Sequence, residues 1–410
     1  MRPASITRMH HPPMKIRKYL FRIHRWSGIA LAALLVIAGV TGSLLAFHHE
    51  IDGLLNPDLH RTEQKAQRAS LDGIAKAIEA KHPRLVVGYF LFTDNPASSV
   101  QVIMNTREAA ADGRLDRDSP RPTEIYADPY TGQLLGERNW GEIGGTRAHL
   151  MPMIYRLHMS LFLDKTGQWI TGIVAAIWIV GILIGMFLAV PRLKLLRKAF
   201  TVKWQANRAR VLFDLHRTVG LVSGLLLIVT AFTGLYMNLP AIMEPALAAV
   251  APFTERPASL RPAGTQLDQV WQIGWDEAVR RARAAHAVDP IAGVGRIESR
   301  GYYQVRFMPA GDIMDSGTIR VFINGRNGAV LGKFDHREGT VGDKIRIWQF
   351  PLHSGQGFGM PGRVLICIVG LVPPLLAVTG IWLWLRRRRH RRLASHAREA
   401  ADNPLPLGAE

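Results

Sequence analysis

The chain has 410 residues, 48% of them hydrophobic, and its 51 Lys+Arg against 32 Asp+Glu give a formal net charge of +19. A charge this positive is typical of proteins that bind nucleic acid or an acidic membrane surface, so its position along the chain has to decide between the two. The one cysteine, Cys367, excludes a disulfide within the chain and excludes zinc or iron–sulfur sites built from cysteines.

Four windows of the sequence carry no charged residue and are long enough to cross a bilayer. A helix of about 20 apolar residues spans a hydrocarbon core of ~30 Å, and each window has 21 to 26 residues. In chain order they are Ser27–Phe47, Gln168–Pro191, Thr218–Met243 and Val364–Leu385. We therefore predict an α-helical membrane protein with four transmembrane helices. The first helix is expected to be retained, because it exceeds the roughly 7–15 apolar residues of a signal peptide and no Ala-x-Ala site follows.

The positive charge is concentrated in three short segments outside these windows. Residues 1–26, 190–217 and 386–410 have net charges of +7, +7 and +4, which together are 18 of the +19. The two long segments, 49–157 and 237–352, are nearly neutral. Because short cytoplasmic loops carry the excess of Lys and Arg, we predict a bacterial inner-membrane protein with both termini cytoplasmic, both long segments periplasmic and no nucleic-acid partner.

These patterns define the expected organisation of the chain. In order, we expect a basic cytoplasmic N-terminus (1–26), a first transmembrane helix (27–47), a first periplasmic domain (48–157), a second transmembrane helix with a preceding interfacial segment (158–191), a cytoplasmic loop (192–215), a third transmembrane helix (216–243), a second periplasmic domain (244–352), a fourth transmembrane helix with a preceding interfacial segment (353–385) and a basic cytoplasmic tail (386–410).

Sequence landmarks recur at a nearly constant offset between the two halves of the chain. The segment His24-Arg25-Trp26-Ser27-Gly28 opens the first span, and His216-Arg217-Thr218-Val219-Gly220 opens the third, 192 residues later. The other repeated landmarks are Thr41-Gly42 with Thr233-Gly234, residues 128–136 with 324–332, and Leu157-His158 with Leu352-His353. We predict an internal duplication in which each half is one span, one periplasmic domain and one span.

Each periplasmic segment is predicted to be a small α+β unit. Apolar residues at helical spacing indicate helices over 70–82 and 275–286. Strands are expected over 85–92, 100–104, 291–297, 302–308 and 318–323. Residues 128–132 and 324–328 are typical of hairpin turns, in which Gly132 and Gly328 adopt a positive φ. Residues 105–122, rich in Asp, Arg and Pro, are expected to form an exposed loop.

Four of the 15 histidines lie at repeated landmarks near membrane ends and are the candidate functional residues. His24 and His216 open spans on the cytoplasmic side, whereas His158 and His353 precede spans on the periplasmic side. If the halves pack about a pseudo-twofold axis, one pair meets at each face. Two imidazoles that face each other across a bundle suit the two axial positions of a haem iron. The alternative is a set of interfacial histidines whose rings lie at the headgroup level.

Glycines near the cytoplasmic pair are compatible with a flat macrocycle. Gly28 lies on the same helical face as His24, and Gly220 lies on the same face as His216. Glycines at such positions also permit close helix packing without any cofactor.

Three further side chains are secondary candidates. Arg25 and Arg217 could pair with haem propionates, although arginine at a cytoplasmic edge also follows from topology alone. His48 lies at the periplasmic end of the first span and has no counterpart in the second half, so it is a candidate substitute ligand or substrate contact.

The order of these motifs resembles that of the PepSY-associated transmembrane family, which includes bacterial iron-regulated membrane proteins and ferric-siderophore reductases. The resemblance covers roughly residues 15–390 and rests on His24–Gly28, Thr41-Gly42, Asp128–Gly132 and the two Leu-His landmarks. It implies PepSY-type periplasmic domains. From its reductase members it also implies two b-type haems, one near each face. The second half departs from the pattern at Asn324, where the first half has Asp128-Pro129.

The function that we expect from this resemblance is haem-dependent reduction of a ferric siderophore, or another ferric chelate, with release of Fe²⁺. The cytoplasmic segments are too short for a flavin or nicotinamide domain, so the expected donor is a quinol or a separate cytoplasmic reductase. Pro373-Pro374 in the fourth span could make room for a quinol or could merely shape the bundle. Two other classes stay open: a non-redox PepSY-type regulatory or ligand-binding membrane protein, and a transporter component built on repeats.

Overall fold

The computed structural model describes residues 14–107, 123–190, 196–260, 267–314 and 316–402. The chain divides into two compact units, with one boundary inside each of four long apolar helices. The helix unit comprises residues 1–43, 173–235 and 367–410, and the sheet unit comprises residues 44–172 and 236–366.

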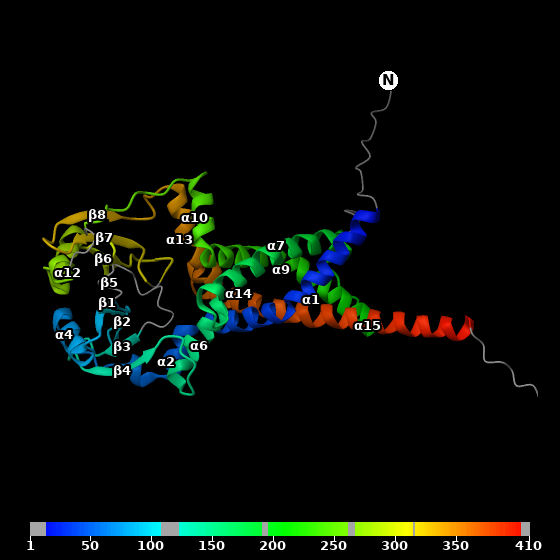
Figure 1. Cartoon of the computed structure of the whole chain (residues 1–410), viewed down its shortest axis with the longest axis horizontal. Coiled ribbons are helices and arrows are strands. Elements are labelled where there is room, and N and C mark those ends of the chain that lie inside the picture. Colours follow the sequence, from blue (N-terminus) through cyan, green and yellow to red (C-terminus); the bar gives the residue numbers. More distant parts are fainter. Residues whose placement is uncertain (1–13, 108–122, 191–195, 261–266, 315, 403–410) are drawn as a thin grey trace, which may run out of the picture. The chain divides into compact units, whose positions relative to one another are not determined.

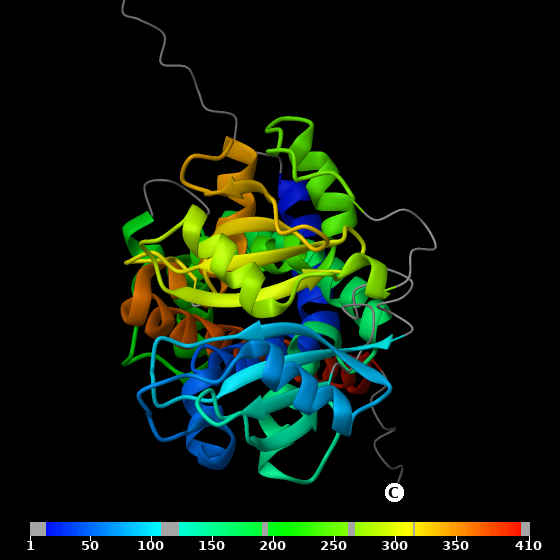
Figure 2. The same ribbon diagram turned by 90° about the vertical axis from the view of Figure 1, so that its left-hand side faces the viewer.

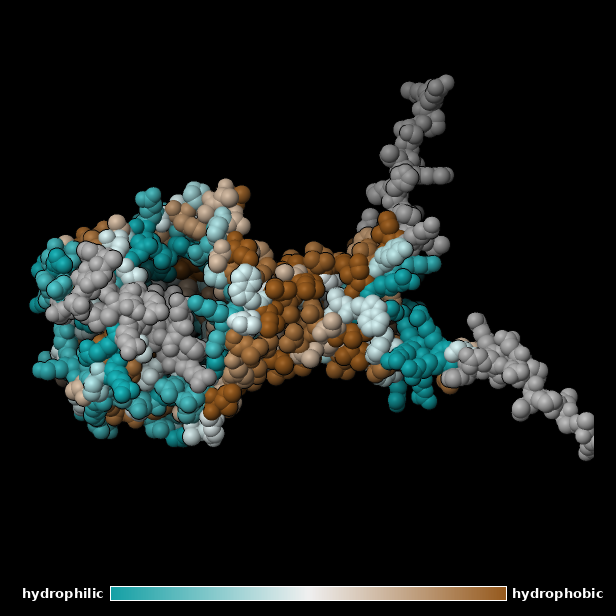
Figure 3. Space-filling model, in the orientation of Figure 1, coloured by the Kyte–Doolittle hydropathy of each residue, from teal (hydrophilic) through white to brown (hydrophobic). Residues whose placement is uncertain are grey.

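Four long apolar helices confirm the prediction of a membrane protein. They are α1 (Met14–Leu45), α7 (Asp164–Ala189), α9 (Arg208–Asn238) and a fourth made of α14 (Gly359–Gly370) and α15 (Val372–Asp402). Only 11–28% of each apolar window is buried by protein, and hydrophobic side chains cover the surface of these helices (Figure 3). An apolar surface of this extent requires lipid around it.

The fourth span is interrupted at Leu371, between α14 and α15. The hydroxyl of Ser43 in α1 donates a hydrogen bond to the carbonyl of Cys367 at 2.8 Å, close to the turn that the prolines disturb. A Cβ at Gly39 of α1 would overlap the carbonyl oxygen of Gly370. The interruption is therefore packed tightly against α1, as expected of prolines that shape a bundle.

The sheet unit contains one antiparallel sheet of eight strands in the order β4-β3-β2-β1-β5-β6-β7-β8 (Figure 2). The strands are β1 (Leu85–Leu91), β2 (Val100–Thr106), β3 (Thr123–Ala127), β4 (Leu134–Asn139), β5 (Ile291–Ile297), β6 (Tyr302–Phe307), β7 (Ile319–Asn324) and β8 (Val330–Phe334). The expected loop over 105–122 is thus wrong at its start, because β2 continues through Thr106; the remainder lies outside the described residues.

The two α+β segments share this sheet because β1 pairs with β5, a contact that the sequence did not predict. Phe90 lies opposite Val294, and Tyr89 lies opposite Gly295. A Cβ at Gly293 or Gly295 would overlap the ring of Tyr89. Glycine at these two positions therefore allows β5 to approach β1 closely enough to extend the ladder.

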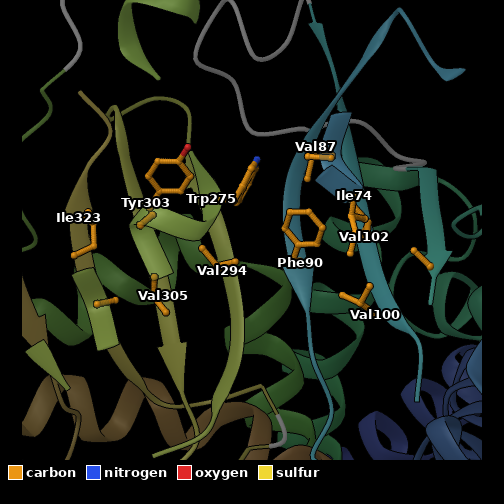
Figure 4. Packing of buried hydrophobic residues seen from close by; sticks show 14 of the residues in the cluster. Ile74, Val87, Phe90, Val100, Val102, Trp275, Val294, Tyr303, Val305 and Ile323 are labelled. Atoms are coloured by element: carbon orange, nitrogen blue, oxygen red, sulfur yellow. The ribbon is translucent and has the colours of Figure 1, made fainter. Parts of the chain in front are cut away.

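Helices α4 (Leu71–Lys81) and α12 (Trp275–Ala285) cover one face of the sheet (Figures 1 and 2). Their apolar sides and the strands form one continuous core that includes residues from both segments, with Phe90 packed edge-on against Trp275 at 5.0 Å (Figure 4). The same core contains Ile74, Val87, Val100, Val102, Val294, Tyr303, Val305 and Ile323.

The N-termini of α4 and α12 cap each other. Asp72 accepts hydrogen bonds from the amides of Trp275 at 2.7 Å and Asp276 at 3.1 Å. Asp276 accepts in turn from the amides of Leu71 and Asp72, both at 3.0 Å. Each carboxylate thereby satisfies free N–H groups at the start of the other helix, where the helix dipole also favours a negative charge.

The two predicted hairpin turns are confirmed, and they are nearly superimposable in their hydrogen bonding. Gly132 and Gly328 have φ values of 71° and 73°. The side chain of Asp128 accepts from the amide of Tyr130 at 2.7 Å, and that of Asn324 accepts from the amide of Arg326 at 2.8 Å. Asn and Asp both form this type of turn, so the change from Asp128 to Asn324 leaves the local geometry intact.

Short helices connect the apolar spans to the sheet. They are α2 (His48–Leu55), α3 (Pro57–His60), α6 (Arg147–Ser160), α10 (Pro240–Ala248), α11 (Leu267–Val270), α13 (Val341–Ser354) and the 3₁₀ helix η3 (Gln356–Phe358); α8 (Leu196–Ala199) lies between α7 and α9. His158 and His353 therefore lie near the ends of separate helices, α6 and α13, which precede the second and fourth spans.

A buried network of charges ties α2 to the sheet. Arg138 of β4 contacts Glu124 of β3 at 2.8 Å and Asp52 of α2 at 2.9 Å. His60 also contacts Asp52, at 3.0 Å. Burial alone would raise the pKa of Asp52, but hydrogen bonds from His60 and Arg138 outweigh it and lower the pKa to about 2. Asp52 is thus an anion at neutral pH and depends on Arg138 for compensation.

Candidate functional site

The first candidate site is the pair formed by His24 of α1 and His216 of α9. Their ring centroids lie 6.3 Å apart, with an angle of 77° between the ring planes. The two helices belong to opposite halves of the sequence and both histidines belong to the helix unit. The structure thus brings together the two residues that sequence position alone predicted to meet.

Each of these histidines uses its Nδ1 atom in a hydrogen bond to a neighbouring span. Nδ1 of His24 lies 2.9 Å from the carbonyl oxygen of Gly181 in α7, so it must carry the proton. Nδ1 of His216 lies 2.9 Å from the hydroxyl of Thr379 in α15. Because that hydroxyl donates to the carbonyl of Leu375 at 2.8 Å, its oxygen accepts from His216. Both rings are thereby held with a free lone pair on Nε2, as a metal-binding histidine requires.

Two glycines on neighbouring spans leave the space that these imidazoles occupy. A Cβ at Gly185 of α7 would lie 2.8 Å from Cε1 of His24, and a Cβ at Gly380 of α15 would lie 3.3 Å from Cε1 of His216. The sequence analysis missed both glycines. A signal was present, because Gly185 and Gly380 are separated by 195 residues, the same offset as the two Leu-His landmarks.

The glycines that were predicted near this site differ in their surroundings. A Cβ at Gly28 would meet no atom within 4 Å, whereas a Cβ at Gly220 would meet the side chain of Leu376 at 3.7 Å. Open space thus lies beside α1, one turn from His24, and a packed helix contact lies beside α9.

The two candidate arginines also differ. The Arg217 side chain donates to the carbonyls of Lys198 and Thr201, at 2.8 and 2.9 Å, and pairs with the buried carboxylate of Asp214 at 3.0 Å. It therefore anchors the segment between α7 and α9. Arg25 stacks on Trp26, with its guanidinium carbon 5.2 Å from the ring centroid. The buried Nε of both arginines has no hydrogen-bond partner among the described residues. Arg217 already pairs with Asp214, whereas no carboxylate of the described residues pairs with Arg25, so Arg25 is the better placed of the two to receive an anionic group.

The second candidate site is the pair formed by His158 of α6 and His353 of α13. Their ring centroids lie 6.0 Å apart, with an angle of 62° between the ring planes. Both residues belong to the sheet unit, and again they come from opposite halves of the sequence.

The backbone immediately after His158 is strained. Leu161, Phe162 and Asp164 adopt positive φ values of 51°, 62° and 50°, which side chains other than glycine rarely tolerate. Arg156, which is 3% exposed, donates to the carbonyl of Phe162 and to the carboxylate of Asp164 and so stabilises this turn. Such local strain is typical of functional sites, and here it ends α6 directly beyond the histidine.

His48 lies beside α6 but does not form a pair equivalent to the other two. Its ring stacks on His49 with centroids 3.8 Å apart and contacts the edge of Tyr155, one turn before His158, at 6.0 Å. Its Nδ1 lies 3.1 Å from the carbonyl of Leu45. Burial, together with the neighbouring His49, lowers the pKa of His48 to about 4, so His48 is neutral at physiological pH.

The dimensions of both pairs fit an iron atom between the rings. A histidine nitrogen lies about 2 Å from a bound metal and about 1.1 Å from the centre of its own ring, so two rings on opposite sides of one metal have centroids about 6.2 Å apart. The observed separations are 6.3 and 6.0 Å. In the part of the chain that the structure describes, no three His, Cys, Asp or Glu side chains converge as a metal site. Each pair of histidines would thus provide two nitrogen ligands to a metal that a cofactor carries.

Four long apolar helices, two of which bring His24 and His216 together, and an antiparallel α+β region define an integral membrane protein. The chain matches the family model of the PepSY-associated TM region over residues 21–387 and belongs to that family. No curated protein matches the chain.

Proposed function

We propose that this protein is a di-haem reductase of the bacterial inner membrane, which passes electrons from the cytoplasmic side to a periplasmic ferric siderophore and so releases Fe²⁺. The observation that supports it best is the duplicated histidine pair. Each pair takes one residue from each half of the sequence, and each has the ring separation of two axial ligands on one iron.

In this proposal His24 and His216 hold one haem b, and His158 and His353 hold the other. Haem at these sites would supply one-electron transfer, because iron with two protein ligands has no open position for oxygen chemistry. The carbonyl of Gly181 and the hydroxyl of Thr379 keep the first pair in the correct tautomer. Hydrogen bonds of this kind also raise the basicity of a ligating imidazole.

The orientation follows from charge. The basic segments at both ends and between α7 and α9 are placed in the cytoplasm, and the sheet unit is placed in the periplasm. We also propose that the chain arose by duplication: the strand order is symmetric about the β1–β5 contact, and the two hairpin turns have the same hydrogen bonds. The proposed electron donor is a quinol or a separate cytoplasmic reductase.

The proposal is tested by a reduced-minus-oxidised visible spectrum of the detergent-purified protein, with a pyridine haemochrome assay for stoichiometry. We expect sharp b-type bands and two haems per chain. A colourless protein after expression with ample haem supply would contradict the proposal. It would leave a non-redox regulatory or ligand-binding membrane protein as the better account, with a transporter component as the second alternative.

The hydrogen bond from His216 to Thr379 provides a more local prediction. Thr379→Val keeps the shape of the side chain but removes the acceptor for Nδ1 of His216, so we expect haem at the first site to bind about 10- to 100-fold more weakly. Titration of haem into the haem-depleted protein measures this affinity. Thr218→Val is the matched control, because the Thr218 hydroxyl donates to the backbone carbonyl of Ala199. Equal affinities in the two variants would contradict the assigned role of Thr379.

A further inference from the structure

The face of the sheet opposite α4 and α12 carries two arginines side by side. Arg306 of β6 lies directly opposite Arg320 of β7 in the strand register. Their neighbours Val305 and Val321 point into the core under the helices, so alternation along the strands places both arginines on the other face. Like charges directly opposite each other on neighbouring strands are unfavourable, and this pair therefore requires a compensating feature.

In the first half of the chain, the hairpin of β3 and β4 also carries an arginine, and its charge is compensated. There Glu124 of β3 lies opposite Arg138 of β4, four residues before the turn at Asp128, and the two form an ion pair at 2.8 Å. Arg320 holds the same place relative to the turn at Asn324, but the residue opposite it is Phe334. The first hairpin therefore carries an ion pair at this place, whereas the second carries an arginine opposite a phenylalanine.

Further arginines increase this positive charge. Arg346 of α13 and the exposed Arg256 both act electrostatically on Arg320. Asp343 pairs with Arg346 at 3.0 Å, and Glu244 acts on Arg256.

The described part of the chain supplies no counter-ion to Arg306 or Arg320. Among the described side chains no carboxylate forms an ion pair with either, and the buried Nε atoms of both have no hydrogen-bond partner. Burial, with the charges of Arg306 and Arg256, lowers the pKa of Arg320 to about 9. An unpaired guanidinium in such surroundings is costly, since buried charges are normally paired.

Aromatic rings hold three of these guanidinium groups in place. Arg306 lies over Tyr89 at 5.2 Å, Arg320 over Phe334 at 5.7 Å and Arg346 over Phe253 at 4.5 Å, each measured to the ring centroid. A ring that covers one flat face of a guanidinium orients the group. It leaves the N–H groups at the edge available for a carboxylate or another oxyanion, which they can bind in a bidentate manner.

We propose that Arg256, Arg306, Arg320 and Arg346 form a binding site for a soluble anion with several carboxylate or similar oxygen groups. The identity of the natural ligand rests on the proposed function: it is the electron acceptor itself, a ferric chelate with a net negative charge. The site selects by charge: a polycarboxylate ferric chelate fits it, whereas a cationic trihydroxamate ferric chelate does not. In the first half Glu124 is the counter-ion of Arg138; in the second half the bound ligand is the counter-ion of Arg320.

The test uses the full chain in detergent, with citrate and ferric citrate as probes and a cationic trihydroxamate ferric chelate as the control ligand. Calorimetric titration and thermal unfolding are compared for the native protein, Arg320→Gln, Arg306→Gln and Arg280→Gln. Arg280 is the matched control, because it lies on α12 with a 74% exposed side chain. We expect ferric citrate to bind and stabilise the native protein and the control. Loss of a charged hydrogen-bond donor should weaken binding about 10- to 100-fold in the two site variants.

Arg320→Gln has a second expected signature. Removing an unpaired, half-buried cation should raise the unfolding temperature of the ligand-free protein, so weakened binding cannot be explained by a damaged fold. Unchanged citrate affinity in Arg306→Gln and Arg320→Gln would overturn the proposal. Loss of haem from these variants with unchanged citrate affinity would also overturn it, and would assign the arginines to haem propionates, since Arg346 and His353 lie on the same helix.

The two proposals can fail separately. A colourless protein that still binds citrate through Arg320 would disprove the reductase and retain the anion site. A protein with two haems that binds no anionic chelate would retain electron transfer and disprove the anion site.

Discussion

Replacing His24 or His216 with alanine is expected to remove one of the two haems and to leave the other in place. In the proposed function each histidine would supply one of the two protein ligands at its site, and the rings of His24 and His216 lie 6.3 Å apart. His158→Ala and His353→Ala should remove the other haem. The haemochrome assay measures the number of haems per chain, and redox titration shows which of the two potentials is lost.

The control for this series is His82→Ala. His82 is a partly exposed histidine of the sheet unit that pairs with Glu137 at 3.1 Å, so its removal should leave both haems bound. The assignment of His24 with His216 makes a stricter prediction than the number of haems alone. His24→Ala and His216→Ala must abolish the same potential, and the double variant must lose no more haem than either single variant. Loss of the same haem in His24→Ala and His158→Ala would show that the ligands pair within a half instead.

Removing the side chain of Arg138 is expected to destabilise the sheet unit by about 3–5 kcal/mol, the usual cost of leaving a buried charge without its partner. Arg138→Leu preserves much of the side-chain volume but leaves two buried carboxylates without their arginine partner. These are Asp52 and Glu124, which are 6% and 5% exposed. Chemical unfolding in detergent, followed by circular dichroism of the strands, measures the free energy of unfolding.

A surface ion pair in the same region is the control for Arg138. Arg147 and Asp58 contact each other at 2.7 Å with side chains 58% and 60% exposed, so Arg147→Leu should cost at most about 1 kcal/mol. The combined change Arg138→Leu and Glu124→Leu should be less destabilising than Arg138→Leu alone, since it removes one stranded charge. A loss below about 1 kcal/mol in Arg138→Leu would contradict the assigned role of the network.

The features predicted correctly from the sequence are those with a local signal. Uninterrupted apolar windows predict the spanning helices. The turns at Asp128 and Asn324 are predicted by the glycine that follows each of them at the same sequence spacing. The missed strands β4 and β8 are the two edges of the sheet and carry few buried residues, so they lack the clear alternation by which strands are recognised. The missed strand β3 has five residues, four of them buried, and shows no alternation either.

The features that could not be predicted depend on contacts between distant parts of the chain. The pairing of β1 with β5 rests on Gly293 and Gly295, whose importance appears only when Tyr89 is placed against them. Gly185 and Gly380 do share the repeat offset of 195 residues, but their contacts with His24 and His216 become visible only once the helices are packed together. Repeat symmetry nevertheless indicated which histidines approach each other, because an equal offset along the chain becomes an equivalent position in the folded structure.

The mutual capping of α4 and α12 means that neither half of this protein is complete by itself. A polypeptide ending after the second span would leave the first turn of α4 without Asp276, the edge of β1 without β5, and each histidine without the ring opposite it. Such a half could make these contacts only as a twofold homodimer, in which the carboxylate of each subunit caps a helix of the other. Because one chain carries both halves, their association does not depend on concentration, and the halves can differ: Glu124 and Arg320 hold opposite charges at corresponding places in the sheet, which no symmetric dimer allows.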